Sequence, residues 1–247
     1  MAKPHRIASA QHLDAALDSL LAADARFHPV VRRTGRPKFV PRRKHGFEAL
    51  VDIVVSQQLS IAAADTIFGR VKEKVSPFTP ENLLATPAEV LRACGLSAPK
   101  QKHMKSIATA ILDGSLDLKR IRTMQDDDAR AHLTAVKGIG PWTADIYLMG
   151  SLGRADIWPV GDVGLQAAIT RVLKLKKRPN EKAMERLSKN WRPWRTIAAR
   201  LFWIHEDGIR KEKREALKAE AVAKKAALEK KPGKKNPVKP KKKAKKK

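Results

Sequence analysis

Apolar residues recur at helical spacing along most of the chain, whereas the alternation typical of β-strands is nearly absent. Near the N-terminus, Leu13, Ala16, Leu17, Leu20 and Leu21 fall on one face of a helix, as expected for a stripe that packs against a core. The pattern therefore predicts an all-α protein.

Candidate helix starts support this class. Thr79-Pro80 and Thr86-Pro87 each place an N-cap residue before a proline suited to the first helical position. Ser97 could cap a helix that runs to Asp113, where Gly114 would end it. Further helices are predicted over residues 126–136, 141–152, 162–175, 181–190 and 193–205, with an Ala, Lys and Glu-rich extension to about residue 229.

The charge of the chain indicates a polyanionic partner, because 52 Lys and Arg against 25 Asp and Glu give a net charge of +27. Residues 209–247 carry +14 of this excess, which leaves +13 on residues 1–208. A basic surface of this kind favours nucleic acid, although an anionic membrane surface or solubility alone would also be consistent with it. Residues 230–247 contain eleven lysines, three prolines and no acid, and we expect this tail to be disordered.

The segment Leu133 to Ile146, LTAVKGIGPWTADI, places two glycines between two predicted helices. Glycine permits positive φ and close approach of another backbone, and the first N–H groups of a helix carry partial positive charge. Such a turn can bind a phosphate oxygen, with Lys137 beside it, although many turns of this kind only reverse the chain.

This segment resembles the helix-hairpin-helix of the DNA glycosylase superfamily. Three other segments agree in the same order along the chain: FEALVDIVVSQQLSIAAA at residues 47–64, LRACGLSAPKQKHMKSIA at residues 91–108, and WRPWR at residues 191–195. The last of these is similar to a segment of the DNA-3-methyladenine glycosylase II (AlkA-type) branch. Lys137 stands where many members of the superfamily have proline.

The resemblance implies a two-lobed helical fold with DNA bent across a cleft. One lobe would comprise residues 46–153 with the hairpin, and the other residues 1–45 together with residues 154–208. Residues 209–247 would form the basic tail, helical at first and then disordered.

The resemblance also implies a carboxylate some twenty residues after the hairpin, and Asp162 occupies that position. From the sequence alone, an Asp after Gly161 and before an apolar run is better explained as a helix N-cap. A fixed carboxylate would stabilise the oxocarbenium-like sugar that forms when an N-glycosidic bond breaks. We therefore expect Asp162 to be catalytic.

The expected activity is a monofunctional DNA glycosylase for alkylated purines such as 3-methyladenine and 7-methylguanine. Members that also nick the strand carry a nucleophilic lysine just after the hairpin, where this chain has Trp142. All five tryptophans lie between residues 142 and 203, and indole faces attract cationic bases. We expect Trp142 and Trp191 to line the base pocket and Trp158 and Trp203 to pack in the core. The sequence assigns no role to Trp194.

Base flipping requires a side chain to fill the gap in the duplex. By resemblance Gln58 occupies the wedge position with Gln57 beside it, although two glutamines on a polar turn could also be surface residues. The residues expected to bind DNA phosphates are Lys137, Gly138, Ile139, Gly140 and Thr143.

No metal site or cofactor is expected, because the single cysteine and the seven histidines show no metal-ligand spacing. The resemblance implies only a possible monovalent cation at the hairpin carbonyls. The expected partner is double-stranded DNA with alkylated bases, bound by a cytoplasmic, DNA-associated monomer without contact to a membrane. The alternatives are a bifunctional glycosylase/lyase for oxidised bases and a non-catalytic DNA-bending module.

Overall fold

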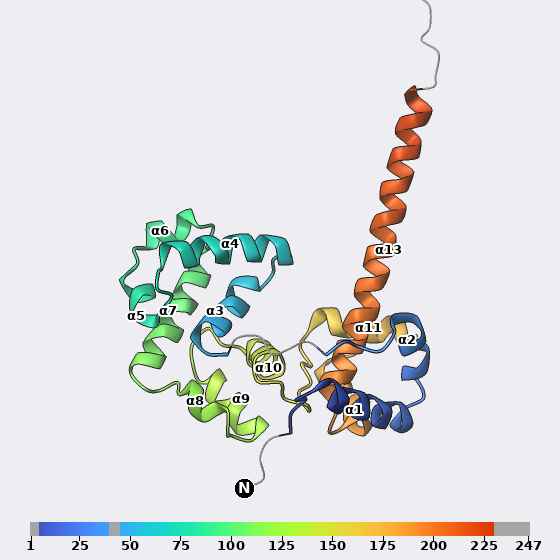
Figure 1. Ribbon diagram of the computed structural model, residues 1–247, viewed down its shortest axis with the longest axis horizontal. Coiled ribbons are helices and arrows are strands. Elements are labelled where there is room, and N and C mark those ends of the chain that lie inside the picture. The colour runs from blue at the N-terminus through green and yellow to red at the C-terminus, as the bar shows by residue number, and fades with distance from the viewer. Residues whose placement is uncertain (1–4, 40–44, 230–247) are drawn as a thin grey trace, which may run out of the picture. The chain divides into compact units, whose positions relative to one another are not determined.

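The computed structural model describes residues 5–39 and 45–229, and this part of the chain is helical (Figure 1). No strand occurs among these residues, which confirms the all-α class; the one β-bridge joins Arg6 to Arg154. The helices are α1 (Ala10–Ala23), α2 (Phe27–Thr34), α3 (Phe47–Ser56), α4 (Ile61–Lys74), α5 (Pro80–Ala85), α6 (Ala88–Ala93), α7 (Ala98–Leu112), α8 (Leu118–Ile121), α9 (Asp126–Thr134), α10 (Pro141–Gly150), α11 (Val163–Val172), α12 (Glu181–Ser188), the 3-10 helix η1 (Lys189–Trp191) and α13 (Arg195–Glu229).

Several helices begin with a side-chain N-cap, whereas Ser97, at the start of α7, makes no such hydrogen bond. The Thr79 side chain accepts the Asn82 N–H at the start of α5, and Asn180 caps α12 in the same way. Thr86 differs from the prediction, because its hydroxyl donates to the Asn82 carbonyl at the end of α5 and Pro87 is the residue that precedes α6. When two short helices follow each other directly, one threonine can close the first instead of opening the second.

The chain forms two compact units, Met1–Glu206 and Asp207–Lys247. In the first unit, α3 packs against α4, α7 and α10, and α10 also packs against α9 (Figure 1). Helix α7 in addition contacts α5 and α6. These contacts bring α10 and α7, which carry the candidate site, onto the same helix α3.

The N-terminal segment of the first unit pairs with residues that follow α10. Ile7 N–H donates to the Gly153 carbonyl, and Ala155 N–H donates to the His5 carbonyl. Helix α1 packs against α2 and η1. A division of residues 1–206 into two lobes stays a prediction.

An aromatic cluster fills the core beside α2. Trp191 is 1% exposed and packs edge-to-face against Phe27 and Trp158, with Phe202 also in contact. Its indole N–H donates to the Asp24 carboxylate at 2.7 Å. The prediction that Trp191 lines a base pocket is therefore wrong: its ring is enclosed by other aromatic side chains.

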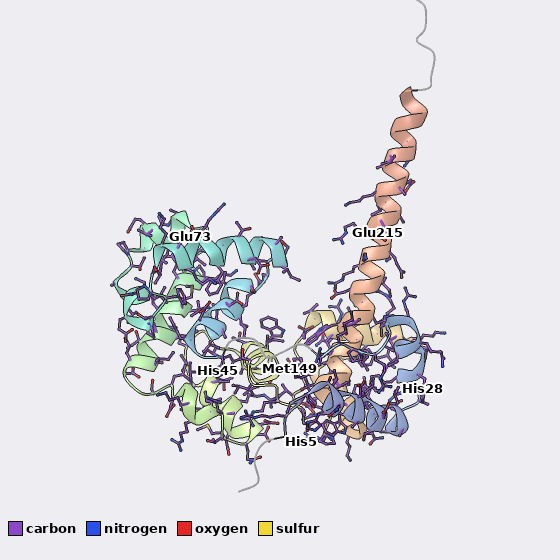
Figure 2. The ribbon with its side chains drawn as sticks, in the orientation of Figure 1. His5, His28, His45, Glu73, Met149 and Glu215 are labelled. Carbon is purple, nitrogen blue, oxygen red and sulfur yellow. The ribbon has the colours of Figure 1, made fainter. Side chains whose placement is uncertain are left out.

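In the second unit, residues 207–229 continue α13 as a helix, as the Ala, Lys and Glu-rich composition predicts. Glu215, labelled in Figure 2, is exposed and pairs with Lys211 four residues earlier at 4.0 Å. Such exposed pairs contribute little stability. The disorder predicted for residues 230–247 concerns a segment outside the described residues.

Within the described ranges, no helix has both the length and the apolar character that crossing a membrane requires.

The hydrogen-bonded carboxylate of Asp24 gives a testable pH dependence. Hydrogen bonds from Arg26 and Trp191 hold the pKa of Asp24 down at about 2, below its ordinary value of 3.8. A lowered folded-state pKa stabilises the fold above pH ~4 and loses this effect as the pH falls towards 2. We expect Asp24→Asn to lower the free energy of unfolding by about 2 kcal/mol at pH 7.

Urea unfolding followed by tryptophan fluorescence measures this difference. The difference in free energy of unfolding between Asp24→Asn and the unmodified chain should become smaller between pH 4 and pH 2. The control is Asp18→Asn, which removes an exposed partner of Arg36 and should change the free energy of unfolding by less than about 1 kcal/mol. A difference that stays constant across this pH range would contradict the proposed role of the Asp24 carboxylate.

Candidate active site

The turn between α9 and α10 is a tight hairpin. Val136 N–H donates to the Leu133 carbonyl, and Ile139 N–H donates to the Val136 carbonyl at 3.0 Å. Gly140 precedes Pro141, which is the first residue of α10. Since the first N–H groups of a helix lack partners within the helix, those at the start of α10 remain available for an external acceptor.

Gly138 lets this hairpin lie directly on α7. Its φ is +98°, and a Cβ built on it would lie 2.6 Å from the Cβ of His103 and 2.9 Å from the His103 Cα. A Cβ does not fit at these distances, and the obstacle includes the backbone of a helix. The hairpin therefore requires glycine here for two independent reasons, conformation and space.

Two of the residues predicted to bind phosphate have other roles. Ile139 is 3% exposed, and its N–H is already engaged by Val136, so it anchors the hairpin in the core. Thr143 is buried, and its hydroxyl accepts a hydrogen bond from the Gln57 side chain at 2.8 Å. A phosphate contact by the Ile139 N–H is corrected accordingly. The Thr143 hydroxyl keeps its own hydrogen to donate, and phosphate binding stays a prediction for Thr143, for the exposed Lys137 and for the two glycines.

The predicted wedge residues lie in the turn between α3 and α4. Leu59 N–H donates to the Ser56 carbonyl, and Gln57 has φ −54° and ψ 129°. Gln58 follows with φ +58°, so the turn is of type II, which normally has glycine or asparagine at this position. Gln58 is exposed at the tip of the turn, and its wedge role stays a prediction.

The hairpin and this turn line one hollow of roughly 470 Å³. Asp162 and Trp191 are not among the residues that line it. The lining residues are Gln57, Gln58, His103, Gly138, Gly140, Pro141, Trp142 and Thr143.

Asp162 is fixed by three N–H donors. It is the N-cap of α11, where Oδ1 accepts the Leu165 N–H at 2.5 Å. The indole of Trp142 donates to Oδ2 at 2.7 Å, and the indole of Trp203 donates to Oδ1 at 3.2 Å. Each carboxylate oxygen has two lone pairs, so Oδ1 is fully used and Oδ2 keeps one for a further partner.

Asp162 therefore combines the two roles that the sequence allowed, a helix cap and a held carboxylate. Trp142 joins it to the hollow, because Trp142 is one of the lining residues and its indole N–H reaches Oδ2. Catalysis by Asp162 and base binding by Trp142 stay predictions, and this arrangement is what supports them.

Trp203 is the residue that sequence reasoning missed. The sequence predicts only a packing role for Trp203, and it does pack against the core, but its indole N–H also reaches the Asp162 carboxylate, 41 residues away in sequence. The only signal in the sequence was the concentration of tryptophans between residues 142 and 203. Trp158 is a core residue as predicted, 1% exposed.

Among the described residues, no group of three or more His, Cys, Asp or Glu could hold a metal ion. A monovalent cation at the hairpin stays a prediction. The carbonyls of Val136 and Gly140 each accept one backbone N–H, and a second lone pair on each oxygen suits such an ion. It would supply positive charge next to a DNA phosphate.

Comparison with known proteins shows which family has a sequence of this kind. Residues 51–193 match the family described as "HhH-GPD superfamily base excision DNA repair protein". The chain is 34% identical over 190 residues to "DNA-3-methyladenine glycosylase 1" of Schizosaccharomyces pombe, covering 74% of this chain and 83% of that protein. It is 30% identical to "Alkylbase DNA glycosidase-like protein mag2" of the same yeast, covering 76% of this chain and 93% of the relative.

Two solved structures are similar in fold and sequence. The S. pombe 3-methyladenine DNA glycosylase (Mag1) in complex with abasic DNA has a TM-score of 0.70 at 32% identity, covering 76% of this chain and 95% of that one. DNA-3-methyladenine glycosidase from Bacillus halodurans has a TM-score of 0.69 at 32% identity, covering 80% of this chain and 91% of that one.

The two hairpin glycines give a matched pair of variants. Gly138→Ala should lower the free energy of unfolding by more than about 2 kcal/mol or displace the hairpin, because the new Cβ meets the backbone of α7. Gly140→Ala should have little effect on stability, since φ is −82° and the added Cβ meets open space. Urea unfolding of both variants measures this; equal stabilities would show that the approach to His103 is not a constraint.

Proposed function

Because the chain belongs to the HhH-GPD superfamily of base excision DNA repair proteins, we propose that it is a monofunctional DNA glycosylase that removes alkylated purines by base flipping. Its relatives named as DNA-3-methyladenine glycosylases support this substrate class. The observation that carries the proposal is the Asp162 carboxylate, held by three N–H groups and joined through Trp142 to the hollow between hairpin and wedge turn.

The hairpin would hold the DNA through a phosphate. The free N–H groups at the start of α10 and the exposed Lys137 supply partial and full positive charge at the same place. Gln58, at the tip of the type II turn, would enter the gap that the flipped nucleotide leaves. Since the hairpin and this turn line the same hollow, the phosphate contact and the insertion of Gln58 into the duplex would occur next to each other.

Asp162 would then stabilise the sugar. As the glycosidic bond lengthens, positive charge develops on the deoxyribose, and the remaining lone pair of Oδ2 is the part of the carboxylate free to face it. Water attacks the oxocarbenium-like carbon and completes hydrolysis, leaving an abasic site. Trp142 and Trp203 hold the carboxylate in place throughout.

The base itself would be selected by charge. Purines methylated at N3 or N7 are cationic, and an indole face attracts a cation by about 0.5–2 kcal/mol. A cationic base also leaves without a strong general acid. Double-stranded DNA is accordingly the proposed partner, a cytoplasmic, DNA-associated location is part of the proposal, and a monomeric state stays a prediction.

The decisive measurement is release of 3-methyladenine and 7-methylguanine from methylated duplex DNA. Asp162→Asn should lower the single-turnover rate by about 10²–10³-fold, the usual cost of removing one transition-state electrostatic partner. DNA binding should remain, because asparagine also caps helices well.

Asp117→Asn is a matched control, since Asp117 caps α8 by accepting the Lys119 and Arg120 N–H groups. This variant should release base at the rate of the unmodified chain. Equal rates for all three proteins would mean that Asp162 is only a cap, and binding without release by the unmodified chain would indicate a DNA-bending module.

A second test concerns strand nicking. Trp142 stands at the position of the nucleophilic lysine in bifunctional members, and an indole cannot form a Schiff base with the sugar. We therefore expect the products to contain intact abasic sites. Borohydride added during turnover should trap no covalent protein–DNA adduct; an adduct would favour the glycosylase/lyase alternative.

A further inference from the structure

The segment Gly95 to Lys100, at the start of α7, has no part in the chemistry described so far. Its lysine reaches across to the end of α3. The Lys100 Nζ donates to the Val55 carbonyl at 2.7 Å and to the Gln57 carbonyl at 2.8 Å. Val55 lies in the last turn of α3, and Gln57 lies in the wedge turn.

An ammonium group suits this position. The last carbonyls of a helix lack intrahelical partners and carry partial negative charge. Lys100 satisfies one of them and extends the same contact to the first residue after the helix. It is half-buried, and this burial lowers the pKa of its ammonium group.

The bond to the Gln57 carbonyl acts on Gln58. Because the peptide group is planar, the direction of the Gln57 oxygen fixes the plane of the bond between Gln57 and Gln58. Gln58 leaves that plane with φ +58°, a conformation that is unfavourable for a residue with a Cβ unless its surroundings hold it. Lys100 supplies one of those restraints.

A second restraint acts on the same residue. The Gln57 side chain donates to the Thr143 hydroxyl on α10 at 2.8 Å, so Gln57 is held at its backbone by α7 and at its side chain by α10. Gln58 is left as the exposed tip. Three residues after Lys100 on α7, His103 receives the Gly138 backbone of the hairpin.

We propose that Lys100 is a positioning residue for base flipping, which holds the turn at residues 56–59 so that Gln58 enters the duplex in register with the hairpin. The inference rests on the proposed glycosylase function. Lys100 does not touch substrate; its effect passes through the Gln57 carbonyl to the tip of the turn.

Lys105 provides a matched control on the same helix. Its Nζ donates to the Thr86 carbonyl at 3.0 Å and to the Leu84 carbonyl at 3.4 Å, at the end of α5. Lys105 therefore makes the same kind of contact, a half-buried ammonium on the carbonyls of a helix end, at a place away from the wedge turn. A purely structural role would make the two lysines equivalent.

The experiment compares Lys100→Met with Lys105→Met in the full chain, with Lys100→Arg as the conservative variant. One readout is the single-turnover release of 7-methylguanine. The other is the fluorescence of 2-aminopurine placed beside a tetrahydrofuran abasic analogue in a duplex, which rises when the wedge unstacks it. Urea unfolding reports stability, and Lys100→Gln replaces Lys100→Met if that variant does not fold.

We expect both Met variants to lose similar stability. Only Lys100→Met should slow base release and weaken the fluorescence response. The expected slowing is about 10–100-fold, which is the usual effect of displacing a positioned group by a small distance. Lys105→Met should stay within about twofold of the unmodified chain, and Lys100→Arg should recover most of the rate because it restores charged donors.

Rates and fluorescence of Lys100→Met that match those of Lys105→Met would overturn the inference. Failure of the proposed function looks different, because the unmodified chain would then release no methylated purine. In that case the fluorescence readout alone decides: a response that Lys100→Met weakens and Lys105→Met preserves supports Lys100 as the positioning residue, and equal responses refute it.

Discussion

The approach of the Gly138 backbone to α7 is the constraint on which the candidate site depends. No side chain can be placed between the hairpin and His103, because a Cβ at Gly138 would meet the Cβ, Cγ and Cα of His103, which cannot move without α7. One helical turn earlier on α7, Lys100 holds the carbonyls at the end of α3. Helix α7 thus aligns the two loops that line the hollow, although it contributes only His103 to the lining itself.

The donors that hold Asp162 are all electrically neutral. Two indole N–H groups and one backbone N–H fix the carboxylate, and no Lys or Arg ion pair is recorded for it among the described residues. A salt bridge would fix it equally well but would cancel much of its charge before the sugar becomes cationic. Neutral donors give the same positional restraint and leave the negative charge for the transition state.

Sequence patterns predicted the elements of the site better than the partners of each side chain. Helical periodicity predicted α10, and the glycines and Pro141 predicted the hairpin, both from local signals. Asp162 came from the resemblance to the glycosylase superfamily, because from the residues alone it is better explained as a helix N-cap. The partners of Trp203 and Trp191 were not predicted, because tertiary packing alone decides which indole reaches Asp162 and which reaches Asp24.

Ile139 shows the same limit at a smaller scale. Its place between two glycines suggested an open backbone, whereas its apolar side chain enters the core and its N–H closes the turn. An apolar residue in a polar turn is therefore better interpreted as the anchor of that turn than as part of its binding surface. The same reasoning separates Gln57, tied to Thr143, from its neighbour Gln58, which is exposed at the tip.

The chemistry of the hollow bears on which bases can leave. None of its lining residues, all within the described part of the chain, is an aspartate or glutamate, and His103 is the one lining side chain of a type that can protonate a departing base. Where no acid assists, cleavage depends on how well the base carries away the bonding electrons, and a purine that is already cationic does so far better than a neutral one. Selectivity for a cationic base would then follow from the leaving group together with indole attraction.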